Sequence, residues 1–331
     1  MSQLRRDPIT GRWIIVNYEK VVKPDDFSFE KPEKTGITKN CPFCPGNEKL
    51  TPPEIVAHRK VGQPNTSGWT IRVIPNKYPA LGAEGNLSKT GMGVFDKMNG
   101  VGTHEVIVDI PEHMLDMGDI SDSQAEEVIW SYLGRSTDLQ KDPRFKYILI
   151  FRNYGRSAGA SLEHPHSQLI ALPIVPKRVN EELHSSMEYF SYKDRCVFCD
   201  VLGQELADKE RIVEENKSFI SFCPFVSRFP YETWIMPKSH ESHFTSVKKE
   251  EVRPLGEILR DTMRRLKKLL NDPPYNYIIH TSPINGFEKE YYHWHIEIMP
   301  KLINVAGFEW GSGFYVNPVP PEIAANNLNS V

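Results

Sequence analysis

Two stretches of this chain carry the same series of landmarks, and this repetition constrains the fold more than any other feature of the sequence. Each stretch has a Cys-x-x-Cys pair, an apolar run that leads to a histidine, a helical pattern, a second apolar run and a His-x-His. The histidine and the His-x-His are 51 residues apart in one stretch (113 to 164) and 53 in the other (240 to 293). The sequence therefore predicts a duplicated domain.

The apolar runs that precede the single histidines can be aligned directly. Residues 104–113 read HEVIVDIPEH, and residues 231–240 read YETWIMPKSH. This alignment places Glu105 beside Glu232 and His113 beside His240.

A helix is predicted after each of these runs. Residues 121–124 (SDSQ) read as a capping box, and apolar residues between 252 and 270 keep a helical period. Both helices are predicted to stop before an Asp-Pro pair, at 142–143 and 272–273. Strands are expected over 147–151, 168–173, 277–281 and 296–300.

These patterns predict an α+β fold made of two histidine-triad-like domains. Each domain is expected to be an antiparallel sheet with one long helix. The boundary lies in the polar stretch near 175–195, so we assign residues 1–178 to the N-terminal, catalytic domain and residues 179–331 to the C-terminal domain.

The two Cys-x-x-Cys pairs indicate zinc. Structural zinc takes four Cys and His ligands in tetrahedral geometry, and the repeat supplies two matched sets. The predicted ligands are Cys41, Cys44, His113 and His164 in the first half and Cys196, Cys199, His240 and His293 in the second. His243 in place of His240, and His295 in place of His293, stay open as alternatives. Cys223 lies among apolar residues, which predicts a buried side chain.

Broad features of the chain exclude several classes of protein. No apolar run reaches the roughly 18 residues that a membrane helix needs, and the N-terminus has no apolar segment that would mark a signal peptide. We therefore expect a cytoplasmic protein, without disulfides. The net charge is −3 and aromatic residues are not interleaved with basic clusters, so no nucleic-acid partner is expected.

The most informative stretch is SLEHPHSQ, residues 161–168. In a strand, His164, His166 and Gln168 point to one side, so His166 lies beside a zinc-bound histidine with a free ring nitrogen. A neutral imidazole is a competent nucleophile for phosphorus when its other nitrogen is held, for example by a backbone carbonyl. Gln168 can donate to a phosphoryl oxygen, and the preceding Gly/Ser loop can supply backbone N–H groups and the Ser161 hydroxyl.

The second half lacks this combination. Its counterpart reads HWHIE over residues 293–297, and a carboxylate at Glu297 would repel a phosphate. The sequence therefore predicts one catalytic half and one supporting half.

These motifs resemble the histidine-triad superfamily, and specifically its galactose-1-phosphate uridylyltransferase branch. The resemblance covers nearly the whole chain, from RDPITGRW at 6–13 through VIPNKYPAL at 73–81 and HPHSQ at 164–168 to GFE at 307–309. It implies a two-step exchange. A histidine attacks the α-phosphorus of UDP-glucose and releases glucose 1-phosphate, and galactose 1-phosphate then takes the uridylyl group.

The resemblance also implies roles for individual residues. His166 is the nucleophile and Gln168 steadies the phosphoryl group. Asn76, Asn153 and Ser161 contact the nucleotide and its phosphates, and Glu309 contacts a sugar hydroxyl. The resemblance further implies a zinc site at Cys41, Cys44, His113 and His164, and a homodimer that binds a nucleotide sugar and a hexose 1-phosphate. The second matched Cys/His set raises the expected content to two zinc ions per subunit.

Some residues depart from the family pattern. Lys20 and Lys23 stand where the well-known enzymes have arginine, and Glu188, His280, His293 and His295 could echo a second Glu/His metal site known in the family. Residues 271–283 and 311–318 look closer to a branch that includes plant ADP-glucose phosphorylase, which passes an adenylyl group to phosphate. Adenylyl transfer therefore stays open as the main alternative to uridylyl transfer. A hydrolase and a zinc-stabilised nucleotide-binding protein without catalysis stay open beside it.

Overall fold

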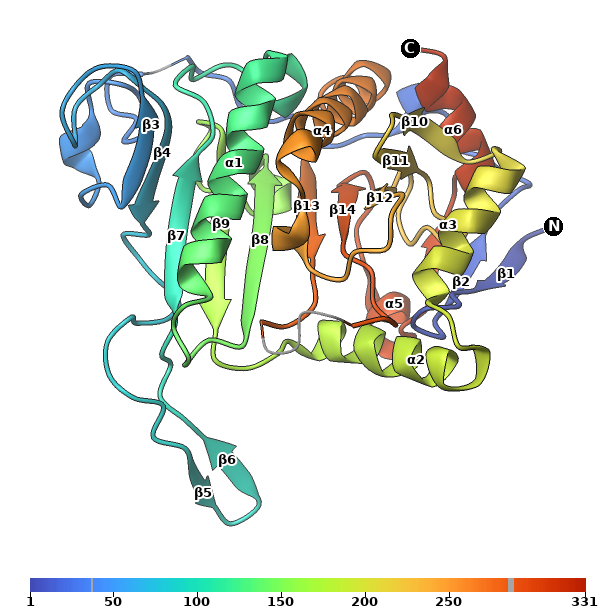
Figure 1. The fold of residues 1–331 in the computed structure, drawn as a ribbon. Coiled ribbons are helices and arrows are strands. Elements are labelled where there is room, and N and C mark those ends of the chain that lie inside the picture. The colour runs from blue at the N-terminus through green and yellow to red at the C-terminus, as the bar shows by residue number, and fades with distance from the viewer. Residues whose placement is uncertain (37, 285–288) are drawn as a thin grey trace.

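The computed structural model describes residues 1–36, 38–284 and 289–331. Within them, ten strands form one antiparallel sheet, whose two edges are β10 and β3 (Figure 1). From edge to edge the order is β10 (Ile212–Glu215), β11 (Phe219–Phe222), β12 (Thr233–Pro237), β14 (His295–Pro300), β13 (Tyr275–His280), β8 (Tyr147–Tyr154), β9 (His166–Leu172), β7 (Thr103–Val108), β4 (Trp69–Pro75) and β3 (Val56–Arg59).

The order of the strands confirms the duplication. Counted outward from the centre, β8-β9-β7-β4-β3 mirrors β13-β14-β12-β11-β10, and the two five-stranded units join where β8 pairs with β13. The sequence predicted two sheets, and the structure joins them into one.

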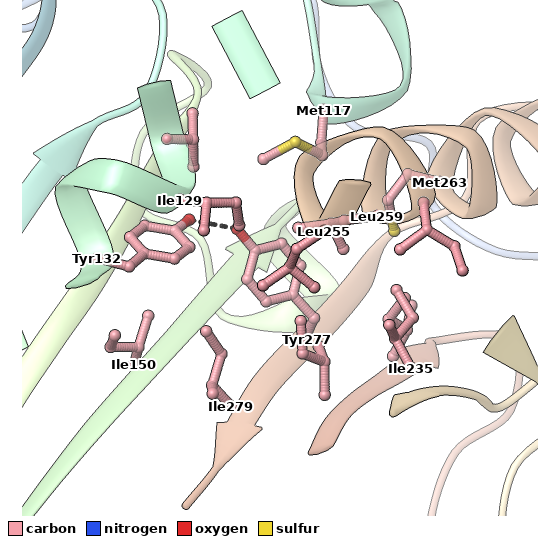
Figure 2. Close-up of a cluster of buried hydrophobic side chains, with 14 of the residues drawn as sticks. Met117, Ile129, Tyr132, Ile150, Ile235, Leu255, Leu259, Met263, Tyr277 and Ile279 are labelled. Atoms are coloured by element: carbon pink, nitrogen blue, oxygen red, sulfur yellow. Dashed lines mark hydrogen bonds between the residues drawn. The ribbon is translucent and has the colours of Figure 1, made fainter. Parts of the chain in front are cut away.

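The two long helices lie side by side on one face of the sheet (Figure 1). They are α1 (Asp122–Leu139) and α4 (Lys249–Leu270). Figure 2 shows their apolar side chains pointing toward those of β8, β12 and β13, for example Leu255 and Leu259 toward Tyr277. This layer is the largest hydrophobic cluster, and both predicted helices are confirmed.

The predicted capping box of α1 is only half correct. The Ser121 side chain accepts the backbone N–H of Gln124 at 3.2 Å, as an N-cap should. The Gln124 side chain, however, donates to the backbone carbonyls of Thr70 and Asp109 at 2.9 and 2.7 Å instead of reaching back to the cap. It therefore ties the helix to the sheet.

The alignment of Glu105 with Glu232 is wrong by one residue. Gln168 pairs with Val106 in the first half, and its counterpart Glu297 pairs with Trp234 in the second. The residue equivalent to Glu232 is therefore His104. Glu105 points to the opposite face, where it forms an ion pair with Arg135 of α1 at 2.7 Å.

Several elements lie outside the repeat. Helix α2 (Lys177–Lys193) occupies the stretch in which the sequence predicted only a polar boundary, so the proposed boundary at 178/179 falls in its first turn. The chain also forms α3 (Val197–Asp208), α5 (Gly307–Ser312), α6 (Pro321–Asn329), a sheet of β1 (Gln3–Arg6), β2 (Trp13–Val16) and β15 (Tyr315–Asn317), and a projecting hairpin of β5 (Thr90–Met92) and β6 (Phe95–Lys97) (Figure 1).

None of the described helices has the length and apolarity needed to cross a membrane.

Helices α1 and α4 approach each other most closely at Gly256. A Cβ added at this position would lie 2.8 Å from the backbone carbon of Ala125 and 2.9 Å from the backbone nitrogen of Glu126. Only a residue without a Cβ fits here unless the helices move apart.

We expect Gly256→Ala to destabilise the fold by about 1–3 kcal/mol, although alanine is the better helix former. Urea denaturation measures this difference. Gly134→Ala is the matched control, because a Cβ there meets nothing within 4 Å and should stabilise the fold by up to about 1 kcal/mol. Equal effects of the two substitutions would contradict the close helix contact.

Candidate active site

His166 begins β9, which lies between β8 and β7 in the first half of the sheet. It pairs with Val108 of β7, and Gln168 pairs with Val106. Because side chains alternate along a strand, His166 and Gln168 share the face of the sheet away from α1 and α4. The cluster on that face contains Phe43 and Trp69, and His166 is buried there.

One ring nitrogen of His166 is held and the other is free. Nδ1 donates to the backbone carbonyl of His164 at 2.8 Å, the kind of partner expected from the sequence. Phe43 packs edge-on against the ring, at 5.2 Å between centroids. Nε2 has no hydrogen-bond partner among the described residues. Burial lowers the pKa of His166 to about 4, so the imidazole is neutral near pH 7.

Gln168 belongs to a cluster that includes one residue not predicted from the sequence. His104 Nδ1 accepts the backbone N–H of Ala80 at 3.3 Å, and His104 Nε2 donates to Gln168 Oε1 at 2.8 Å. This leaves the amide N–H groups of Gln168 for another acceptor. The Nδ2 of Asn76 lies 3.1 Å from His104 Nε2, so the predicted residues Asn76 and Gln168 lie together. In the sequence, the only indication that His104 belongs to the site was its alternation with Val106 and Val108, which places these three side chains on one face of a strand.

Asn153 lies beside His166 on the β8 side, and Ser161 belongs to the loop between β8 and β9. Continuing the pairing of Arg152 with Ser167 places Asn153 opposite His166, and its Oδ1 accepts a hydrogen bond from Asn276 at 2.7 Å. Ser161 is exposed and lines a groove of about 240 Å³ with the turn at 155–156 and Ala160.

Gly155 lets this loop turn tightly beside the sheet. Its φ is +83°, and an added Cβ would lie 2.7 Å from the Cβ of Pro274. The loop from 155 to 161 is therefore held against the end of β13.

Glu309 is not brought to this cluster within the chain. Its Oε2 accepts the backbone N–H of Ala306 at 3.0 Å and caps α5, and this is the only hydrogen bond of the Glu309 side chain in the part of the chain that the structure describes. Lys20 and Lys23 are also exposed and lie outside the cluster.

The first predicted metal group is assembled as expected. Cys44 Sγ lies 3.3 Å from His113 Nδ1 and 3.4 Å from His164 Nδ1, and with Cys41 the four ligand atoms lie within 4.8 Å of one another. The Nε2 of His164 donates to the carbonyl of Ile110 at 2.8 Å, which directs Nδ1 toward the metal position.

The second group is built in the same way. Cys199 Sγ lies 3.2 Å from His240 Nδ1 and 3.5 Å from His293 Nδ1, and Cys196 completes the set. The Nε2 of His293 donates to the carbonyl of Pro237 at 3.0 Å. His243 instead accepts the N–H of Thr245 with Nδ1, and neither it nor His295 belongs to this group. Both groups could hold a metal ion.

A third group of buried ligand-type residues differs from the expected Glu/His set. It contains Glu182, not the exposed Glu188, together with His280, His295 and Glu297. His280 reaches both glutamates, with Nδ1 3.2 Å from Glu182 and Nε2 3.4 Å from Glu297. Burial disfavours its charge, but the two carboxylates outweigh burial and raise the pKa of His280 to about 10. The group is therefore an ion-pair cluster, with one protonated histidine between two carboxylates.

The second half does not offer a nucleophile. His295, the counterpart of His166, is fully buried and stacked between Trp234 and His280, with centroids 4.6 and 4.8 Å away. Glu297, the counterpart of Gln168, is neutralised by Arg228 at 2.7 Å. Because His295 is fully buried and its Nε2 is enclosed, no phosphorus atom can reach that nitrogen.

A buried polar network supports β9 on the helix side of the sheet, and the sequence did not predict it. The hydroxyl of Ser167, next to His166, donates to Asp109 at 2.8 Å, and Arg152 bonds both Asp109 and Asp116. Burial raises the pKa of Asp109 to about 6, although Arg152 opposes that change. The network fixes the strand that carries His166.

Known proteins are similar to this chain over its whole length. An ADP-glucose phosphorylase from Arabidopsis thaliana is 37% identical over 99% of this chain and 93% of its own length. A galactose-1-phosphate uridylyltransferase from Thermotoga maritima is 32% identical over 99% of this chain and 98% of its own. A crystal structure of the Arabidopsis ADP-glucose phosphorylase with bound ADP-glucose has a TM-score of 0.81, at 33% identity, covering 100% of this chain and 99% of that one.

The family assignment covers both halves. Residues 1–176 match the family described as galactose-1-phosphate uridyl transferase, N-terminal domain, and residues 182–313 match its C-terminal domain. This chain therefore belongs to the galactose-1-phosphate uridyl transferase family.

Proposed function

We propose that this protein transfers a nucleotidyl group from a nucleotide sugar to a phosphate acceptor through a covalent nucleotidyl-histidine at His166. The observation that carries the proposal is the geometry of His166, whose Nδ1 is held by the His164 carbonyl while Nε2 is unpartnered beside Gln168. An imidazole held in this way presents its lone pair in a fixed direction.

The reaction balances in two displacements. In the first, His166 Nε2 forms a bond to the α-phosphorus of the nucleotide sugar, and the bond to the bridging oxygen breaks, which releases a hexose 1-phosphate. In the second, a phosphate oxygen of the acceptor attacks the same phosphorus and His166 leaves. The charge on the non-bridging oxygens is stabilised by the amide of Gln168, with Asn153 and Ser161 at the same phosphates. Asn76, beside Gln168, contacts the nucleotide.

Two donor and acceptor pairs fit this scheme. Uridylyl transfer from UDP-glucose to galactose 1-phosphate is the reading that the motifs favour, with Glu309 as the contact to the sugar hydroxyl. Adenylyl transfer from ADP-glucose to inorganic phosphate is favoured by the higher identity to ADP-glucose phosphorylase, 37% against 32%. Glu309 belongs to α5 of the second half and its side chain bonds only Ala306 among the described residues, so we propose that it reaches the sugar bound by a second copy in a homodimer.

One competition experiment distinguishes which base the protein selects and which acceptor it uses. UDP-glucose and ADP-glucose, each labelled in the α-phosphate, are incubated with the protein at equal concentration, and the released nucleotides are resolved. Label in UDP-galactose after addition of galactose 1-phosphate supports uridylyl transfer. Label in ADP after addition of phosphate supports the phosphorylase reaction. Label in nucleoside monophosphate alone, without any acceptor, would contradict both and support a hydrolase.

The two Cys/His groups are proposed to bind zinc as structural ions. Cysteine and histidine ligands in a set of four are typical of structural zinc, and the carbonyl partners of His164 and His293 orient their ring nitrogens. The first ion would fix His164, whose backbone carbonyl holds the ring of His166. Zinc would therefore affect the nucleophile by fixing where His166 lies.

We expect close to two zinc ions per chain by elemental analysis, and close to one in Cys199→Ser, which removes a ligand of the second group. Cys223→Ser is the matched control. Cys223 is fully buried, as expected from the sequence, and belongs to neither group, so this variant should keep both ions. A content near one in the unaltered protein would remove the second zinc site.

A further inference from the structure

His104 lies between two parts of the site that have different tasks in the proposed function. One part is the turn after β4, which carries Asn76, and the other is the amide of Gln168 on β9. The register pairs Val106 with Gln168, and His104 lies two residues before Val106 in β7. Its side chain is therefore a diagonal neighbour of Gln168, on the face of the sheet that carries His166.

The turn after β4 is bound by both the backbone and the side chain of His104. The His104 carbonyl accepts the backbone N–H of Asn76 at 2.8 Å, and Nδ1 accepts the backbone N–H of Ala80 at 3.3 Å. Because a backbone N–H can only donate, Nδ1 must use its lone pair in this bond, and the ring proton lies on Nε2. The turn therefore decides which nitrogen of His104 is the donor.

This proton orients the amide of Gln168. The Nε2 of His104 donates to Gln168 Oε1 at 2.8 Å, so the amide nitrogen of Gln168 turns away from His104. No described residue accepts a hydrogen bond from that nitrogen. Without the donor on His104, the amide is free to rotate by half a turn and present its oxygen instead. An oxygen in that place would repel the non-bridging oxygens of a phosphate.

The amide of Asn76 is oriented by the same turn. Its Oδ1 accepts the backbone N–H of Tyr78 at 2.9 Å, which makes Nδ2 the donor end. Nδ2 lies 3.1 Å from the Nε2 of His104, and two donors form no hydrogen bond with each other. The N–H groups of Asn76 and Gln168 are thus both left for an acceptor that is not among the described residues. Amide donors fixed in advance in this way suit anionic oxygens.

The second half links the equivalent two positions differently. Glu232 and Glu297 stand where the first half has His104 and Gln168, and Arg228 bonds both glutamates, at 2.6 and 2.7 Å. Both halves therefore tie these positions together. Only the first half does so through a direct hydrogen bond that leaves an amide donor free.

We propose that His104 is a positioning residue for nucleotidyl transfer, which fixes the amide of Gln168 so that its N–H groups, and not its oxygen, face the α-phosphate. The proposal rests on the proposed function, since it assigns His104 a part in the transfer to His166. No bond to His104 forms or breaks in the reaction. Because the amide stabilises charge that develops during transfer, loss of this orientation lowers the rate of transfer more than it weakens donor binding.

Two substitutions separate the two side-chain contacts of His104. Asparagine reaches about as far as Nδ1 and keeps a partner for Ala80, whereas glutamine brings an amide nitrogen near the place of Nε2 and still donates to Gln168. The rate of nucleotidyl-His166 formation is measured in single turnovers with α-phosphate-labelled UDP-glucose and ADP-glucose. We expect His104→Asn to lose about tenfold to a hundredfold in rate at a nearly unchanged half-saturating donor concentration.

His104→Gln is the rescue by a conservative change, and we expect it to recover the rate to within about fivefold of the unaltered protein, because the donor to Gln168 is restored. If His104→Asn keeps the rate and His104→Gln loses it, His104 only holds the turn and the proposal is overturned.

A double-mutant cycle with Gln168→Leu tests whether His104 acts through the amide. In the Gln168→Leu background, His104→Asn should change the rate by less than about threefold, because no amide remains to be oriented. A loss of the same size in both backgrounds would show that His104 acts elsewhere. A role in stability alone would give equal losses, so this readout separates the two explanations.

The ring proton can be located without any activity. In nitrogen NMR of protein labelled with ¹⁵N-histidine, the signals of His104 are those missing in His104→Gln, and we expect the proton on Nε2. A proton on Nδ1 would overturn the proposal, even if His104→Asn fails to fold. The two proposals fail in different ways. Absence of label on His166 in the unaltered protein refutes the proposed function, whereas unaltered labelling in His104→Asn refutes only the role of His104.

Discussion

His166→Gly is expected to reduce nucleotidyl exchange by on the order of 10⁶-fold, the size of effect seen when a covalent nucleophile is removed. The reason lies in the geometry. Nδ1 of His166 is held by the His164 carbonyl, and Nε2 has no partner among the described residues on the strand face that also carries Gln168. The assay follows transfer of label from UDP-glucose or ADP-glucose to the acceptor, and circular dichroism follows the fold.

His184→Gly is the control for this variant. His184 is an exposed residue of α2, and among the described residues its ring bonds only the carbonyl of Asn180. Its replacement therefore removes a histidine side chain outside the sheet. We expect its exchange rate to stay within about threefold of the unaltered protein, because it lies outside the cluster around His166. Exchange in His166→Gly at a comparable level would remove His166 from the mechanism.

Arg152→Met is expected to cost about 3–5 kcal/mol of the free energy of unfolding, because it leaves two buried carboxylates without their cation. Arg152 and Asp109 are almost completely buried, and Asp116 bonds the second guanidinium nitrogen at 2.6 Å. Urea denaturation at pH 7 measures the loss. Arg156→Met, four residues further on, is the matched control, since Arg156 is 67% exposed and Glu33 is its only ion-pair partner in the described part of the chain. It should change stability by less than about 1 kcal/mol.

The loss in Arg152→Met should depend on pH, and the sign follows from Asp109. Its pKa is raised above the usual value of 3.8 to about 6 even with Arg152 present, so the folded state holds this proton more tightly than the unfolded state. Asp109 therefore lowers stability as pH rises from about 4 to 6, and removal of Arg152 extends this window upward. We expect the difference between variant and unaltered protein to be smaller at pH 5 than at pH 7. A difference that grows toward pH 5 would contradict the assignment of the network.

The repeated features of the chain were predictable because they obey local rules. Helical periodicity gave α1 and α4, the Asp-Pro pairs marked their ends, and the spacing of cysteines and histidines gave both metal groups. The surroundings of His166 followed from strand alternation, which put His166 and Gln168 on one face of β9.

What could not be predicted depends on contacts between distant segments. The pairing of β8 with β13 joins two sheets through backbone groups that every strand carries, so no residue type marks it. The one-residue shift between Glu105 and Glu232 arises because the strand register, and not the distance to the next histidine, decides which face a side chain takes.

The partners in the buried ion pairs could not be predicted from the sequence either. Glu182 and Arg228 meet Glu297 only in the folded chain, and Glu188 gave the same sequence signal as Glu182.

The central claim is a covalent bond between Nε2 of His166 and the α-phosphorus of a nucleotide. The most direct measurement is incubation with α-phosphate-labelled UDP-glucose and ADP-glucose in separate samples, followed by denaturation, digestion at neutral or alkaline pH and mass spectrometry of the peptide that contains residues 161–168. We predict one nucleotidyl group per chain on this peptide from at least one donor, none in His166→Gly, and its loss on addition of galactose 1-phosphate or phosphate. Exchange activity without any label on this peptide would contradict the account.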